Sequence, residues 1–444
     1  MEQEPSTPSI PFWQQFKLLF KGTMIGILIL LLLIPASYII DLVREREQRQ
    51  AEVQAEVSGK WASAQTLTGP ILVVPYQELV QTADGKIVTR ELNAYFLPEN
   101  LLVKGKLDPE VRKRSLYQVI LYRSDVTMSG NFKPVDPTVL QLRPEQMLPQ
   151  KAHIIMGLTD ARGMEENIVL QWNGAAHKFS PGAENNDVVG KGLVTTVPLT
   201  LDSISGYNFS IHLKLKGSHS FFISPSAEST QASLQSTWKD PSFDGDFLGE
   251  HVVTDSGFTA QWKLLGQNAG LPQYWKGSAH QPGNVRFGVN LIQPADGYAK
   301  TMRAAKYAIL FIGLTFSLFF FIEVLQKRSV HPIQYVLIGL ALSIFYTLLL
   351  SFSEYLNFDM AYIIATLATV ILITLYSKSL FGKWKLALLP GVVLLLLYFF
   401  IYILLQAQDN ALLFGSIGLF FTLALIMYFS RRINWYGTPA LSNS

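Results

Sequence analysis

The sequence AAKYAILFIGLTFSLFFFIEVL, residues 304–325, decides the fold class of this chain. A membrane-spanning helix needs about 20 predominantly apolar residues, and this stretch meets that requirement. The chain stays almost continuously apolar from there to residue 430, whereas residues 41–303 have the mixed composition of a soluble protein. Overall, 49% of the residues are hydrophobic and 16% are charged, which exceeds the apolar content that a soluble core requires. We therefore predict an integral membrane protein with one large domain outside the bilayer.

Six segments are long and apolar enough to cross a membrane as helices. One lies near the N-terminus and the other five follow residue 303. The segments are Gly22 to Ile40, Ala304 to Leu325, Pro332 to Ser351, Met360 to Ser377, Leu386 to Leu405 and Ala411 to Phe429. The predicted fold class is a membrane α-helical bundle of six spans plus a mostly β, antiparallel exported domain.

The basic residues of the short loops predict the orientation. Lys or Arg precedes the first span and follows the second, fourth and sixth, whereas the alternate loops hold acidic residues without Lys or Arg. Basic loops stay in the cytoplasm, so we expect a multi-pass protein of a bacterial inner membrane with both termini inside. Lys300, Arg303 and Lys306 depart from the rule, because they flank the outer end of the second span. The predicted organisation is a cytoplasmic segment at 1–21, an anchor helix at 22–40, a periplasmic stalk and β-rich domain at 41–303, a five-helix bundle at 304–430 and a cytoplasmic tail at 431–444.

The exported domain shows the period of two that is typical of half-buried strands. Phe209, Ile211, Leu213 and Leu215 alternate with polar residues. Similar runs, separated by Gly, Pro, Asn and Asp, occur at Ile87 to Phe96, Ser115 to Phe132, Glu165 to Trp172, Gly192 to Leu199 and Phe258 to Leu265. An antiparallel sandwich or a pair of smaller β modules fits this pattern. Arg44 to Val57 is charged and lacks Gly and Pro, which predicts a helical stalk before the domain.

The motifs of familiar enzyme classes do not occur in the sequence. It has no H-E-x-x-H, G-x-S-x-G, phosphate loop or dinucleotide fingerprint. Ser236-x-x-Lys239 has the spacing of the nucleophile of penicillin-binding enzymes, but that motif needs a helix and Gln231 to Trp238 is β-like. Cysteine is absent and the histidines are scattered, with His212 and His219 the closest pair. We predict a protein that is not an enzyme and has no metal or cofactor.

Nucleic acid is excluded as a partner by the charge pattern. The net charge is +3, and no basic cluster interleaved with aromatic residues occurs. Membrane lipids and a periplasmic or envelope protein are the predicted partners.

Ionisable residues inside spans are costly and therefore candidate functional residues. Glu323 lies near the cytoplasmic end of the second span and His331 opens the third. One hypothesis is a pair at the inner interface, in which a protonated imidazole offsets the carboxylate. The alternative is that both side chains reach water at the interface and close a turn.

Two polar stripes run along the third and fourth spans. Ser343, Thr347, Ser351 and Glu354 share one helical face of the third span. On the fourth span the shared face carries Tyr362, Thr366, Thr369 and Tyr376. Such stripes supply hydrogen bonds between helices, and the alternative is a polar cavity.

Several longer strings resemble a known family. They are TGPILVVPY at 68–76, WKDPSFDG at 238–245, SVHPIQY at 329–335, LLSFSE at 349–354 and RRINWY at 431–436. On these strings the chain resembles the CreD family of inner-membrane proteins of Gram-negative bacteria, from about residue 15 to residue 437. Two positions depart from the family pattern: Asn434 stands where Asp is usual, and Gln408-Asp409-Asn410 replaces a more acidic, aromatic triplet.

The resemblance implies a role in cell-envelope integrity under the CreBC two-component system, and it implies no catalytic residue. The leading hypothesis is a non-enzymatic protein whose β domain binds an envelope partner or ligand. The alternative is a transporter or lipid-handling protein with a polar cavity in the C-terminal bundle, which requires the stripes of the third and fourth spans to line one space.

Overall fold

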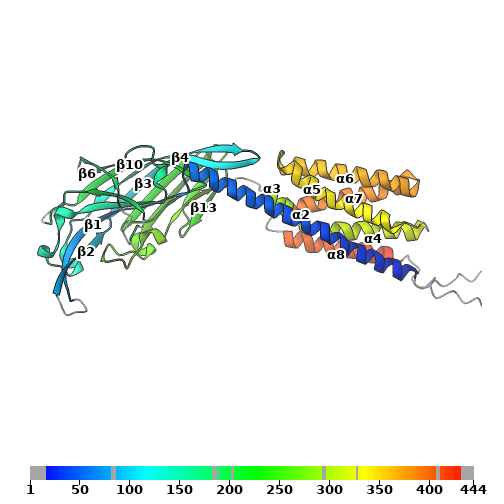
Figure 1. Cartoon of the computed structure of the whole chain (residues 1–444), viewed down its shortest axis with the longest axis horizontal. Coiled ribbons are helices and arrows are strands. Elements are labelled where there is room, and N and C mark those ends of the chain that lie inside the picture. Colours follow the sequence, from blue (N-terminus) through cyan, green and yellow to red (C-terminus); the bar gives the residue numbers. More distant parts are fainter. Residues whose placement is uncertain are drawn as a thin grey trace, which may run out of the picture. The chain divides into compact units, whose positions relative to one another are not determined.

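The computed structural model describes residues 17–81, 87–182, 188–189, 191–201, 205–292, 297–326, 329–406 and 411–431 (Figure 1). The chain divides into two compact units. The helical unit comprises Met1–Arg49 and Ala295–Ser444, and the β domain comprises Gln50–Pro294. Each unit has a hydrophobic core of its own.

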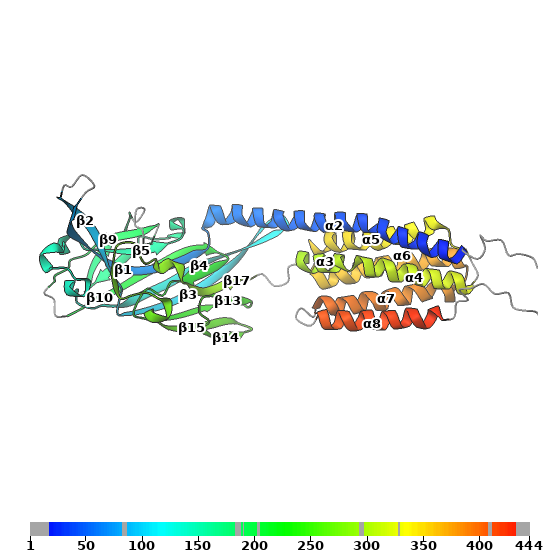
Figure 2. The same cartoon turned by 90° about the horizontal axis from the view of Figure 1, so that it is seen from below.

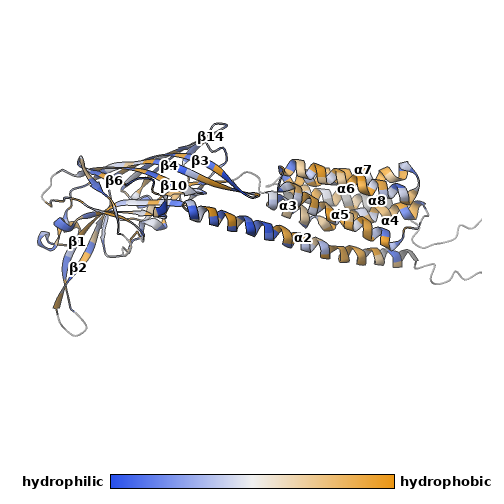
Figure 3. Ribbon diagram, turned by 45° about the horizontal axis from the view of Figure 1, so that its top comes forward, coloured by the Kyte–Doolittle hydropathy of each residue, from blue (hydrophilic) through white to orange (hydrophobic). Residues whose placement is uncertain are grey.

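Helix α2 (Lys17–Trp61) contributes residues to both units and is continuous in Figures 1 and 2. Its first part is apolar and exposes side chains such as Leu30 and Tyr38, which are 65% and 70% exposed. Its second part is charged, and the change of character is visible in Figure 3. The intervals predicted as an anchor and a stalk therefore form one helix.

Seventeen strands make up the described part of the β domain. Their bounds are β1 Gln65–Gln81, β2 Ile87–Phe96, β3 Asn100–Arg114, β4 Tyr117–Phe132, β5 His153–Leu158, β6 Val169–Trp172, β7 Ala175–Lys178, β8 Ser180–Pro181, β9 Gly192–Thr196, β10 Tyr207–Ser218, β11 Ser220–Ile223, β12 Ser229–Ser236, β13 Pro241–Gly245, β14 Glu250–Thr254, β15 Gly257–Leu265, β16 Tyr274–Lys276 and β17 Phe287–Leu291.

The strands form two sheets that share one core. The nine-stranded sheet has the order β13-β17-β11-β1-β5-β9-β8, with β2 on β1 and β16 on β2. The eight-stranded sheet has the order β14-β15-β12-β3-β4-β10-β6-β7. Within the described residues the pairings are antiparallel except for β1 with β11 and β3 with β12. The predicted antiparallel domain is thus confirmed as mostly antiparallel, with these two parallel pairs as a correction.

Alternating burial explains why the strands form where they do. In β10, Phe209, Ile211 and Leu213 are buried, whereas His212 and Lys214 between them are exposed. The strand pairs with β4 over its whole length. Burying one large apolar side chain contributes about 1.5–3 kcal/mol, so a shift of one residue in register would lose several such contributions. This alternation confirms the strand that the sequence predicts.

Among its described residues, the helical unit contains six α-helices besides α2. They are α3 Gly297–Lys306, α4 Ala308–Gln326, α5 Pro332–Ser353, α6 Phe358–Phe381, α7 Trp384–Gln406 and α8 Ala411–Ser430. Within the described residues, five helices are long and apolar enough to cross a membrane: α2, α4, α5, α6 and α7. The sixth predicted span, Ala411 to Phe429, coincides with α8.

The second predicted span begins later than the sequence suggested. We expected it to start at Ala304, but α3 ends at Lys306 and α4 begins at Ala308. The short helix α3 is amphipathic, because Arg303 and Lys306 are exposed and Thr301 is buried on another face. Its exposed basic residues keep it from continuing as a lipid-embedded helix.

Aromatic side chains fill the centre of the bundle. The ring of Tyr398 on α7 lies 4.4 Å from that of Phe311 on α4 and 4.5 Å from that of Phe345 on α5. Tyr362 on α6 is 5.6 Å from Phe345. Tilted and edge-on rings of this kind add packing energy beyond their buried area. The bundle is therefore closed at its centre by rings from four helices.

Candidate functional site

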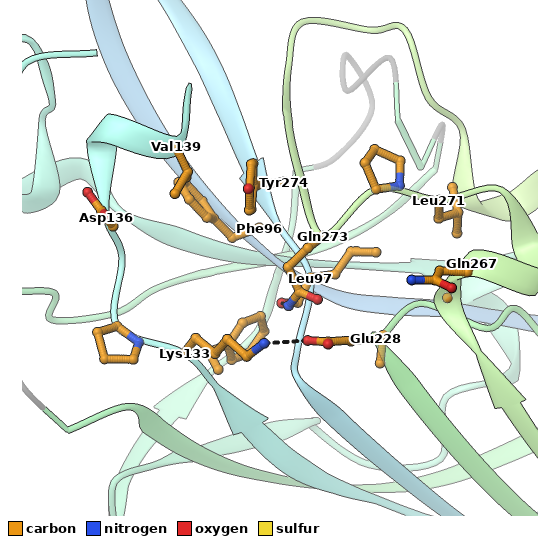
Figure 4. Close-up of a pocket in the computed structure, with 15 residues that line it drawn as sticks. Phe96, Leu97, Lys133, Asp136, Val139, Glu228, Gln267, Leu271, Gln273 and Tyr274 are labelled. Carbon is orange, nitrogen blue, oxygen red and sulfur yellow. Dashed lines mark hydrogen bonds and ion pairs between the residues drawn. The ribbon is translucent and has the colours of Figure 1, made fainter. Parts of the chain in front are cut away.

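A cavity of about 570 Å³ lies in the β domain, where strand ends and connecting segments of both sheets meet. It is lined by Phe96 and Leu97 after β2, Phe132 at the end of β4, Val139 of a short 3₁₀ helix (Pro137–Leu140), Leu271, and Tyr274 of β16, together with the polar residues described below. In Figure 4 the side chains of Phe96, Val139 and Tyr274 lie near one another on one side of the cavity. This side is apolar.

An ion pair lies on another side of the cavity. The Lys133 Nζ atom is 2.5 Å from Glu228 Oε2, and both side chains are about half exposed. Glu99 lies at 3.9 Å from the same ammonium group. The hydrogen bond to Glu228 is the main reason why the pKa of Lys133 is raised. Because this ion pair is exposed to solvent, it contributes little to stability. It nevertheless presents both a positive and a negative charge to a ligand.

Gln273 lines the cavity and has a side-chain oxygen that accepts no hydrogen bond from the described residues. Its Nε2 atom donates to the carbonyl of Leu97 at 2.8 Å, and the backbone N–H of Leu97 donates to the Gln273 carbonyl at 2.9 Å. Its Oε1 atom is buried and has no hydrogen-bond partner within the described part of the chain. A buried acceptor without a partner costs about 1–3 kcal/mol. Because this oxygen has almost no accessible surface, a ligand N–H gains that advantage only where it displaces the side chains that cover the oxygen.

Local backbone features hold the cavity open. A Cβ atom at Gly266 would lie 2.7 Å from the carbonyl oxygen of Ala227, so the close approach of these two segments requires glycine. Gly270 ends the following 3₁₀ turn with φ of +66°. Asp136 caps the Pro137–Leu140 helix by accepting from the Thr138 N–H at 2.9 Å, and the hydrogen bonds from Thr138 lower the pKa of its carboxyl group. The lining segments are therefore preset by their own sequences.

Glu323 has different partners from the one that we hypothesised. Its carboxylate forms an ion pair with Lys21 of α2 and accepts a hydrogen bond from the Tyr335 hydroxyl of α5 at 3.0 Å. Lys21 also donates to the Val330 carbonyl at 3.1 Å. The Glu323 side chain is 9% exposed, so this cluster is a largely buried junction of three helices.

His331 serves as the N-cap of α5. Its side-chain Nδ1 atom accepts a hydrogen bond from the backbone N–H of Ile333 at 3.3 Å. The backbone N–H of His331 donates to Gln334 Oε1 at 2.8 Å. Within the described residues, no ion pair joins His331 to Glu323. The hypothesised pair is replaced by Lys21 and Glu323, because the imidazole acceptor is directed at the first turn of its own helix.

The four residues of the predicted polar stripe on α5 lie in different environments. Ser343 is buried and donates to the Gly339 carbonyl of its own helix at 3.1 Å. Thr347 and Ser351 are exposed. Glu354 lies 3.6 Å from the guanidinium of Arg46 on α2.

The α6 stripe faces the aromatic centre of the bundle. Tyr362 donates to the Tyr398 carbonyl at 2.7 Å, and Thr366 and Thr369 are buried. Tyr376 is partly buried. The side-chain oxygens of Thr366, Tyr346 and Tyr398 are buried without a partner among the described residues. These groups form a small polar centre among rings, and because Thr347 and Ser351 are exposed, the two predicted stripes do not line one shared cavity.

The remaining sequence candidates lie apart from the cavity. Ser236 ends strand β12, so the Ser-x-x-Lys spacing is not on a helix. His212 is half exposed beside Asp125 at 3.6 Å, and burial lowers the pKa of His219. In the described ranges, no group of three metal-ligating side chains comes together. Asn434 and residues 408–410 lie outside the described residues.

The sequence alone did not identify the cavity. Its lining comes from segments near residues 96, 133, 228 and 270, which have no shared motif. The usable signals are the Pro and Gly residues at strand ends, Pro134, Pro137, Gly266 and Pro272. They mark loops but do not show that these loops meet.

The chain was compared with known proteins. It matches the family described as "Inner membrane protein CreD" over residues 17–436. It is 34% identical over 431 residues to "Inner membrane protein CreD" of Escherichia coli (strain K12), covering 94% of each chain. Two crystal structures of M1 zinc metallopeptidase from Deinococcus radiodurans match 44% of this chain and 42% of theirs, with TM-scores of 0.21 and 0.20 and identities of 9% and 7%. These TM-scores are too low to support an argument about fold or function.

Proposed function

Because the chain belongs to the CreD family of inner membrane proteins, we propose that it supports cell-envelope integrity by binding an envelope partner in the cavity of its β domain. The observation that carries this proposal is the cavity itself, with an apolar side, a rim ion pair and the buried Gln273 acceptor. Its volume of about 570 Å³ lies within the usual range of ligand sites. The role is non-enzymatic, because these groups suit recognition of a ligand.

The proposed ligand is a peptide segment of an envelope protein. An apolar side chain of such a segment would occupy the space beside Phe96 and Val139, and a backbone N–H that displaces the side chains covering Gln273 Oε1 would donate to that atom. Extended peptides offer this combination of alternating side chains and free N–H groups. The production of the protein under a CreBC-type two-component system is part of the same proposal, supported by family membership.

The proposed topology has six spans, both termini in the cytoplasm and the β domain in the periplasm. It is supported by Lys378, Lys383 and Lys385 around the connection between α6 and α7, against Glu354 and Asp359 between α5 and α6. Reporter fusions after Lys385 should give a cytoplasmic signal, and insertions at Asp240 a periplasmic one. A cytoplasmic signal at Asp240 would contradict this topology.

The binding role is tested by removing the acceptor. Gln273→Leu keeps the side-chain size but removes the Oε1 acceptor and also the Nε2 hydrogen bond to Leu97, so cells should become more sensitive to detergent at unchanged protein abundance. Gln171→Leu is the control, because Gln171 is an exposed residue of β6 outside the cavity. Wild-type resistance in Gln273→Leu, or equal sensitivity in both variants, would argue against the cavity as the binding site.

A lipid-handling role is the second candidate. The polar stripes give no support to a shared polar cavity, as described above. Two apolar cavities between α4, α7 and α8, described below, do favour contact with lipid.

A further inference from the structure

Two adjoining apolar cavities lie in the helical unit between α4, α7 and α8. Their volumes are about 490 and 500 Å³. Both are lined by Leu314, Ser317 and Phe400, so they form one groove. It extends along the α4 side from Lys306 to Phe321.

Glycine residues hollow the groove. A Cβ atom added at Gly313 of α4 or Gly415 of α8 would meet no atom within 4 Å. Both residues line the groove. The Ser317 hydroxyl donates a hydrogen bond to the Gly313 carbonyl at 2.8 Å, so it offers no free donor to the groove. The groove is therefore open space with an apolar surface.

The length of the groove suits one acyl chain. Within α4, Ala308 and Phe321 are roughly 20 Å apart at 1.5 Å per helical residue. The hydrocarbon core of a bilayer is about 30 Å thick, and one leaflet supplies about half of it. An acyl chain that enters beside Lys306 can thus lie along the groove past the middle of the membrane.

Positive charge marks one end of the groove. Lys306 lines it and is exposed, and Arg303 is exposed one turn earlier on α3. Neither has an acidic partner in the described part of the chain. Lys300 differs, because it contacts Gln406 at 3.1 Å and the ring of Phe358. Lys306 and Arg303 are also two of the three residues that depart from the predicted loop-charge rule, and a bound anion gives them a role.

We propose that this groove binds one anionic glycerophospholipid. Its phosphate pairs with the Lys306 ammonium group, and an acyl chain lies against α4, α7 and α8. The Tyr307 side chain, which also lines this end, is an interfacial aromatic group of the kind enriched at headgroup level. The site is independent of the cavity in the β domain.

The test uses the full-length protein in detergent micelles, titrated with phosphatidylglycerol or phosphatidylcholine of identical acyl chains and followed by native mass spectrometry. One phosphatidylglycerol should bind in preference to phosphatidylcholine. Lys306→Gln should weaken phosphatidylglycerol binding about fivefold, which corresponds to ~1 kcal/mol for one charge near a headgroup. Gly313→Leu should reduce the binding of both lipids, because it fills the groove.

Matched controls separate this site from general lipid contact. Lys378→Gln removes a charge outside the groove. Gly22→Leu adds a side chain where α2 has open space, about two turns from Ile29, the α2 residue that lines the groove. Both should bind like the wild type. Gly415→Leu fills the groove from α8 and replaces Gly313→Leu if that variant does not fold. Equal binding of the two lipids, no effect of Lys306→Gln, or full binding by a groove-filling variant would each overturn the proposal.

Discussion

Two buried carboxylates, one in each unit, are held in different ways. Asp160 in the β domain accepts from Arg162 Nη2 at 2.7 Å, from the Ser63 N–H at 2.9 Å and from the Arg162 N–H at 3.1 Å. Glu323 in the bundle has its contacts from Lys21 and Tyr335 on two other helices. Their side chains are similarly buried, at 8% and 9% exposure. Backbone donors make the first carboxylate part of a turn, whereas the second depends on side chains alone.

Asp160→Ala should have the largest effect. It leaves the Arg162 guanidinium, which also donates to the Gly59 carbonyl, and the Ser63 N–H without their acceptor. The Arg162 side chain is 63% exposed and regains water, so the cost comes from the partly buried donors that lose their acceptor, about 1–3 kcal/mol for each. Native-state hydrogen exchange of the β domain in the full-length protein measures the loss. Asp125→Ala is the control, because its half-exposed contact with His212 is worth less than about 1 kcal/mol; equal losses would show that Asp160 is no structural centre.

Glu323→Leu should cost less, about 1–3 kcal/mol. The Lys21 side chain is 21% exposed and can still reach water, but the Tyr335 hydroxyl loses its acceptor. Replacing both partners of the hydrogen bond, as Tyr335→Phe with Glu323→Leu, should recover most of the loss, because no buried hydroxyl is then left without an acceptor. Thermal unfolding of the helical unit in detergent is the measurement. A double variant as unstable as the two single losses added together would show that the two groups act independently.

The pH dependence of the β domain should be the next largest effect. Hydrogen bonds from Arg162 hold the pKa of Asp160 well below its usual 3.8. A lowered folded-state pKa gives stability that is present above the unfolded value and lost as the pH falls toward the folded one. The gap in stability between wild type and Asp160→Asn should therefore be constant above about pH 5 and shrink below about pH 4. Hydrogen exchange at several pH values tests this, and a gap that widens in acid would contradict it.

The parts of the fold that follow local periodicity were predictable. The alternation in β10 and the long apolar runs indicated the strand and the spans. Strand β1 was missed, because Leu72 and Val74 contact one hydrophobic cluster while Ile71 and Val73 contact another. A strand buried on both faces shows no alternation in its sequence.

The candidate sites depend on contacts that no local pattern encodes. Lys21 and Glu323 are 302 positions apart, so the local sequence suggested His331 at the start of the next span as the partner instead. The cavity in the β domain likewise joins segments from four regions of the chain. The break between α3 and α4 at Tyr307 was missed, because Ala304 and Ala305 make the sequence before it look like part of the apolar run. The structure shows that Lys306 is exposed at the end of α3.

The smallest expected effect separates His331 from Glu323. An N-cap acceptor is worth about 0.5–2 kcal/mol, and the Nδ1 contact with the Ile333 N–H is long at 3.3 Å. His331→Ala should therefore cost roughly 0.5–1 kcal/mol, seen as faster hydrogen exchange in the first turn of α5. His331→Asn should restore protection, because its side chain can accept the same hydrogen bond. Neither variant should reproduce whatever envelope defect Glu323→Gln causes, since the carboxylate contacts Lys21 and Tyr335. A shared defect at normal protein abundance would reinstate the pair that the sequence suggested.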